Sequence, residues 1–112
     1  MRYKIVLVPF PFDDLSSQKV RPAVCLTEPI GIFGHVVLAF ITSSIPSDLL
    51  PTDIALLPQH PDFATTGLRV ASTLRLHRLI TLSFATLQRQ LGELSPTHQS
   101  KVQIGLRNLF NL

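Results

Sequence analysis

Short apolar runs recur along the first two-thirds of this chain, and polar, proline-containing segments separate them. The runs are rich in β-branched residues, which is typical of β-strands rather than helices. We therefore expect strands at residues Lys4–Pro9, Ala23–Thr27, His35–Thr42, Asp53–Leu57, Ala71–Ile80 and Leu87–Leu94, with one helical turn over Thr81–Thr86. His35–Thr42 (HVVLAFIT) is apolar almost throughout, which predicts a strand buried on both faces.

The C-terminal segment changes to a helical pattern. Ser95-Pro96 is a helix-start signature, an N-cap hydroxyl followed by proline at the first helical position. Apolar residues then recur at helical spacing, at Val102, Leu106, Leu109 and Phe110. Short bent strands and one closing helix predict a mainly β fold, a small antiparallel sheet or barrel with the C-terminal α-helix over an open face.

Composition narrows the class of protein. The chain has 112 residues, 46% apolar and 15% charged, which predicts one compact domain spanning residues 1–112. No apolar run approaches the roughly 20 residues of a membrane helix, and Pro9 and Pro11 interrupt the only stretch resembling a signal peptide. The single cysteine, Cys25, excludes an internal disulfide, and we expect a cytoplasmic protein. A net charge of +3 permits an anionic partner such as nucleic acid.

One cation stands out against the strand pattern. Arg21 precedes Pro22 at the edge of the second apolar run, where a strand should be turning apolar. Pro22 lacks an amide hydrogen and so belongs at a strand start or edge. Arg21 is therefore either a solvated strand-edge residue or a cation held at the mouth of a site.

Four stretches together resemble the MazF/PemK-like toxins of type II toxin–antitoxin pairs. The first, VLVPFPFDDLSSQKVRPAVCLT, has a strand ending in Phe-Pro-Phe, a polar loop and a basic-Arg-Pro step. LAFITS resembles the second family signature, a strand ending in Thr or Ser, and STLRLHRLITL resembles the third. LGELS followed by the helix matches the usual family ending.

The resemblance implies a compact SH3-like barrel that forms a homodimer. It also implies a metal-independent, sequence-specific endoribonuclease that cleaves single-stranded RNA through attack by the 2′-hydroxyl, and an antitoxin protein that blocks the site. We accordingly expect no cofactor. We also expect no metal site, because His35, His60 and His98 lack the spacing of metal ligands.

The resemblance points to four catalytic candidates. Arg21 would stabilise charge on the phosphorane, a task suited to a planar guanidinium that grips two oxygens. Thr42 would hydrogen-bond phosphate or orient the arginine, and Arg75 would be the second cation. His77 stands at the usually acidic position of the general base, a role that a neutral imidazole can take. The ordinary alternatives are turn-forming for Thr42 and surface exposure for Arg75 and His77.

Five further residues are candidates for RNA binding. Phe12 would stack on a base, as aromatic side chains of single-strand binders do. Gln18 and Lys19 would close over the RNA and contact phosphate. Ser43 and Ser72 would add hydroxyl contacts. Their ordinary alternatives are a turn former for Ser43 and a small residue at a strand crossing for Ser72.

Two other functions remain open from the sequence. A non-catalytic toxin-like module would inhibit a protein target such as a topoisomerase, or would be a decayed toxin that only binds antitoxin. A plain barrel would bind RNA without cleaving it. The ribonuclease hypothesis is favoured because it accounts for the joint spacing of Arg21, Thr42 and Arg75.

Overall fold

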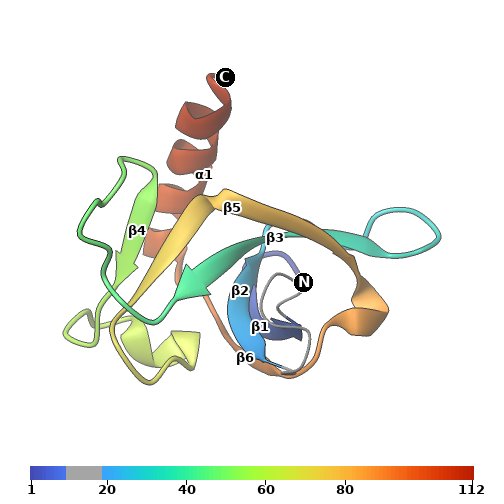
Figure 1. The fold of residues 1–112 in the computed structure, drawn as a ribbon, viewed down its shortest axis with the longest axis horizontal. Coiled ribbons are helices and arrows are strands. Elements are labelled where there is room, and N and C mark those ends of the chain that lie inside the picture. The colour runs from blue at the N-terminus through green and yellow to red at the C-terminus, as the bar shows by residue number, and fades with distance from the viewer. Residues whose placement is uncertain (10–18) are drawn as a thin grey trace.

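The computed structural model describes residues 1–9 and 19–112, whose strands form one curled antiparallel sheet (Figure 1). The sheet has six strands in the order β4-β5-β3-β2-β1-β6. The strands are β1 (Lys4–Pro9), β2 (Val20–Cys25), β3 (His35–Thr42), β4 (Asp53–Leu56), β5 (Ser72–Ser83) and β6 (Gln90–Glu93). Two 3₁₀ turns, η1 (Phe63–Thr66) and η2 (Phe84–Thr86), and one α-helix, α1 (Pro96–Phe110), complete the described elements.

This architecture confirms the mainly β prediction with a C-terminal helix. The strands Lys4–Pro9 and His35–Thr42 have the predicted bounds. β2 begins earlier than expected, because Pro22 pairs opposite Leu7 inside the strand instead of opening it. β5 also continues to Ser83, through residues expected to form a helical turn. The long β3 supplies the pairing partners for this extension.

Both faces of the sheet are buried along its centre, which explains the continuous apolar runs. Successive strand residues point to opposite faces, and the buried residues accordingly form two clusters. The larger cluster is Tyr3, Ile5, Val24, Leu26, Ala39, Ile41, Ile54, Leu56, Leu74, Leu76, Leu94 and Val102. The second cluster, on the other face, is Val6, Val8, Ala23, Cys25, Val36, Leu38 and Phe40.

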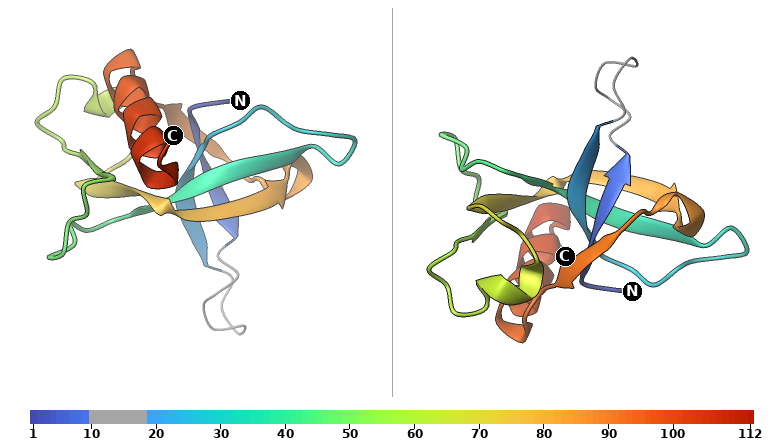
Figure 2. Two further views of the ribbon diagram at one scale, coloured as in Figure 1. Left: turned by 90° about the horizontal axis from the view of Figure 1, so that it is seen from above. Right: turned by 90° about the horizontal axis from the view of Figure 1, so that it is seen from below.

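Helix α1 packs beside β4 and β5 (Figure 2), and its Val102 belongs to the larger cluster. Ser95 caps the helix, and its Oγ accepts a hydrogen bond from the backbone amide of His98 at 3.4 Å. Gly105 lets the helix approach β5, because an added Cβ would stand 2.4 Å from Cδ1 of Leu76. Phe110, expected on the buried stripe, is 56% exposed. In the described part of the chain, no helix is long and apolar enough to cross a membrane.

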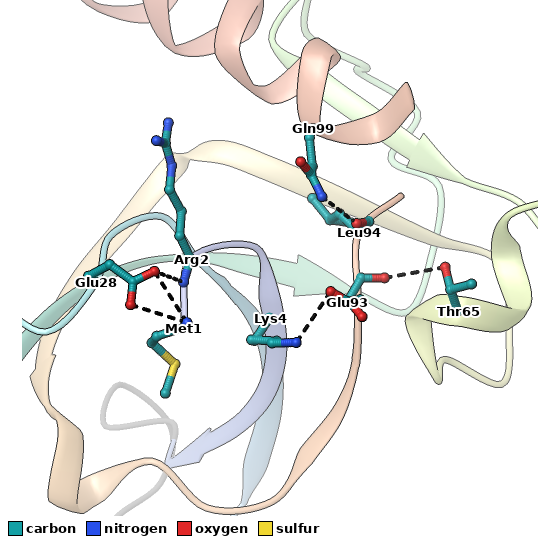
Figure 3. Close-up of polar contacts among 8 residues, drawn as sticks. All are labelled: Met1, Arg2, Lys4, Glu28, Thr65, Glu93, Leu94 and Gln99. Atoms are coloured by element: carbon teal, nitrogen blue, oxygen red, sulfur yellow. Dashed lines mark hydrogen bonds and ion pairs between the residues drawn. The ribbon is translucent and has the colours of Figure 1, made fainter. Parts of the chain in front are cut away.

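Polar contacts join the edge strand β6 to its neighbours (Figure 3). Lys4 Nζ lies 3.3 Å from Glu93 Oε2 across β1 and β6. Gln99 of α1 donates to the carbonyl of Leu94 at 2.8 Å, and the Thr65 hydroxyl donates to the Glu93 carbonyl at 3.4 Å. These contacts connect β6 with β1, with the helix and with the η1 segment.

Candidate functional site

A cleft of about 370 Å³ opens where β2 begins and β3 ends. Two guanidinium groups and three hydroxyl side chains contribute to it, and none of its described lining residues is acidic. The residues that line the cleft are Val20, Arg21, Pro22, Phe40, Ile41, Thr42, Ser43, Ser44 and Arg78. Such a lining presents positive charge and hydrogen-bonding groups to a bound anion.

Arg21 and Thr42 come together at the end of the β2–β3 pairing. The paired residues run from Cys25–Leu38 to Ala23–Phe40, and Arg21 and Thr42 each lie two residues beyond the last pair. Both line the cleft. Arg21 is partly buried there. Two predicted site residues that are far apart in sequence thus line one cleft.

The Thr42 hydroxyl donates a hydrogen bond to a backbone carbonyl in the wall of the cleft. Thr42 Oγ1 donates to the Ser44 carbonyl at 3.0 Å, and Thr73 Oγ1 donates to the same carbonyl at 3.0 Å. These two bonds hold the turn that carries Ser43, which is exposed at the cleft. Because its proton is used, the Thr42 oxygen is suited to accept from a guanidinium, which favours the orienting role over direct donation to phosphate.

Arg75 lies elsewhere, in an ion pair. Its Nε and one terminal nitrogen donate to the two carboxylate oxygens of Asp53, each at 3.1 Å. The Asp53 side chain is fully buried and that of Arg75 is 15% exposed. Asp53 also accepts from the Leu50 amide at 2.8 Å. Arg75 therefore connects β5 to β4 and does not line the cleft.

The remaining candidates have varied positions. His77 is exposed on β5 and does not line the cleft. Ser72 is buried, and its hydroxyl donates to the Val70 carbonyl at 2.8 Å. Lys19 is exposed directly before β2. Phe12 and Gln18 lie outside the described residues. The roles assigned to all of these residues stay predictions.

Arg78 also lines the cleft, although the sequence did not point to it. It follows His77 in β5, and its guanidinium carbon lies 5.6 Å from the centre of the Phe40 ring. Its position depends on an irregularity of β5. Between the Leu74–Ile41 pair and the Leu79–Ala39 pair, four β5 residues stand opposite Phe40 alone. No feature of the sequence signals this irregularity.

Two other side chains of reactive types, Cys25 and His98, are buried. Burial raises the pKa of the Cys25 thiol to about 11, which keeps it protonated and unreactive. His98 is buried, and its ring packs 4.7 Å from that of His60. Among the described residues, no group of three or more His, Cys, Asp or Glu side chains could hold a metal ion.

The sequence model of the PemK-like, MazF-like toxins of type II toxin–antitoxin systems matches residues 1–110. The chain belongs to this family. No curated protein matches it in sequence.

Solved structures of related toxins share the fold. Mycobacterium tuberculosis toxin MazF-mt6 superposes with a TM-score of 0.72 at 23% identity, over 97% of each chain. A MazE–MazF complex from Deinococcus radiodurans gives a TM-score of 0.72 at 19% identity, over 99% of this chain and 95% of that one. An endoribonuclease in complex with its cognate antitoxin, from a mycobacterial species, gives a TM-score of 0.72 at 17% identity, over 100% of this chain and 95% of that one.

Proposed function

We propose that the protein, as one domain of residues 1–112, is a metal-independent endoribonuclease that cleaves single-stranded RNA at specific short sequences. One observation supports the proposal: Arg21, Thr42 and Ser43, which were predicted from the sequence, line one cleft together. RNA is found in the cytoplasm, so we still predict that the protein is cytoplasmic.

The reaction would use the substrate's own 2′-hydroxyl. Its oxygen forms a bond to phosphorus while the bond to the 5′-oxygen breaks, leaving a 2′,3′-cyclic phosphate and a 5′-hydroxyl. The 2′-hydroxyl proton goes to a base, and the departing 5′-oxygen takes up a proton. Arg21 would bind the phosphate oxygens as negative charge develops on them, and Thr42 would orient its guanidinium.

The 2′-hydroxyl proton needs a base. His77 stays the candidate predicted from the sequence, although it does not line the cleft. General acid–base catalysis contributes about 100- to 10,000-fold to a rate. If His77 is the base, His77→Gln should lose cleavage by about this factor while staying folded. An unchanged cleavage rate in His77→Gln would exclude the role.

Membership of the family leads us to propose two protein partners. Structures of related toxins contain an antitoxin, and we propose that a cognate antitoxin also binds this protein. We further propose a homodimer whose interface includes the groove between β4 and α1. This groove of about 610 Å³ includes Ile54, Leu57 and Ile104, and Ile104 is 61% exposed.

The experiment compares the wild type with Arg21→Ala on a long single-stranded RNA in EDTA. Removing a donor aimed at developing charge costs about 100- to 1,000-fold in rate. We expect Arg21→Ala to lose cleavage by this factor while its thermal unfolding stays unchanged. Arg107→Ala, on the exposed surface of α1, is the matched control and should cleave normally. Full activity of Arg21→Ala would refute the assigned mechanism.

A non-catalytic inhibitor of a protein target is the second candidate. It is favoured by one observation, that no carboxylate or imidazole is among the described residues lining the cleft. Expression in growing cells separates the two functions. Growth arrest with intact cellular RNA would support the inhibitor, and arrest with cleaved RNA supports the ribonuclease.

A further inference from the structure

We propose that Arg78 binds an RNA backbone phosphate in the cleft, as its second phosphate-binding cation. This inference deepens the proposed function and rests on it. It concerns a residue that the resemblance leaves without a role.

Two strand registers of β5 meet beside Phe40. The pairs Thr42–Thr73 and Ile41–Leu74, if continued, would place Arg75 opposite Phe40. The pairs from His35–Ser83 to Ala39–Leu79, if continued, would place Arg78 there instead. The two registers differ by three residues, so β5 offers two arginines for one position beside Phe40.

The contacts show which arginine takes the position. Arg75 pairs with the buried Asp53 on the β4 side. Arg78 lies over the Phe40 ring on the β3 side, with 5.6 Å between its guanidinium carbon and the ring centre. The irregularity thus places Arg75 on the β4 side and Arg78 in the lining of the cleft.

The Phe40 ring supports the position of Arg78 in the absence of RNA. Phe40 is 3% exposed and belongs to the second buried cluster, so its ring is held by packing. A guanidinium over an aromatic face is attracted by the ring quadrupole, which orients its plane. Arginine stays charged, and its planar edge grips phosphate oxygens in pairs. Arg78 therefore reaches the cleft in a supported position, next to Arg21 and the Thr42–Ser44 turn.

The test measures binding without chemistry. A 2′-O-methyl RNA cannot attack its own phosphate, so its affinity can be followed by fluorescence anisotropy over a range of salt concentrations. For single strands, each phosphate contact contributes about 0.7 to the slope of log affinity against log salt. We expect Arg78→Gln to weaken binding and to reduce the slope by about 0.7 relative to the wild type.

Two companion variants make the result specific. Arg107→Gln removes the same charge from the exposed surface of α1 and should leave affinity and slope unchanged. Arg78→Lys keeps the charge without the planar fork, so it should keep the slope while binding more weakly. It also serves if Arg78→Gln does not fold.

The outcomes separate this inference from the proposed function. An Arg78→Gln slope equal to that of the wild type, in a folded variant, would overturn the inference alone. The expected slope change in a protein that never cleaves RNA would support the inference and refute the nuclease. A wild type that does not bind the RNA analogue would overturn both.

Discussion

At the scale of single residues, we expect the ion pair between Arg75 and Asp53 to stabilise the fold and not to bind RNA. Asp53 is fully buried and its carboxylate receives two bonds from Arg75. Removing one partner leaves a buried charge without compensation, which costs about 3–5 kcal/mol. We expect Arg75→Gln to lower the free energy of unfolding by this amount in urea denaturation.

A double variant controls this prediction. Asp53→Asn with Arg75→Gln removes both charges, so it should recover part of the lost stability. At a temperature where it is folded, Arg75→Gln should bind RNA like the wild type. Unchanged stability together with weakened RNA binding would instead make Arg75 the functional cation.

The arginines also show where the sequence was informative. Arg21 could be singled out because a charge interrupts an apolar strand pattern beside Pro22. Arg75 and Arg78 could not be told apart, because both lie in one strand segment. Only the three-residue difference in register between the two halves of β5 decides which one lines the cleft. Register of this kind depends on packing across the whole sheet.

At the scale of elements, α1 was the most predictable. Its cap, its proline and its apolar spacing are local signals, and the helix begins at Pro96 as expected. The end of β5 was not predictable, because residues 81–83 become a strand only by pairing with β3. The Phe110 side chain was also misplaced, since helical spacing does not show where the sheet beneath the helix ends.

His98, in the first turn of α1, makes the free energy of unfolding depend on pH. Burial chiefly, and then the nearby His60 and Lys101, lower the pKa of His98, while Asp62 opposes them. The unfolded chain therefore binds a proton that the folded one resists, and stability rises with pH. The contribution of neutral His98 to the free energy of unfolding is complete above pH 6.5, the ordinary pKa of histidine. It is lost as the pH falls below this value.

We expect the wild-type melting temperature to fall as the pH is lowered from 7.5 to 5.5. His98→Gln should show a flatter dependence over the same range, because the group that titrates is gone. Thermal unfolding followed by circular dichroism measures both. Parallel profiles for the two proteins would show that another group is responsible.

At the scale of the whole molecule, α1 exposes two large apolar side chains. Ile104 is 61% exposed beside the groove against β4, and Phe110 is 56% exposed at the helix end. A second copy covering this face would remove the apolar area from water. We expect sedimentation to show a dimer at micromolar concentration and a monomer for Ile104→Glu. A monomeric wild type would contradict the homodimer.

The fold of this molecule is that of the MazF-like toxins, and we propose that its cleft cleaves RNA through the 2′-hydroxyl. The most direct test analyses the product ends after incubation with a long single-stranded RNA in EDTA. The same RNA with a 2′-deoxynucleotide at each mapped cut is the matched control. We predict discrete cuts leaving 2′,3′-cyclic phosphates, and none at the deoxy positions. Intact RNA from folded, antitoxin-free protein, or cleavage at the deoxy positions, would contradict the account.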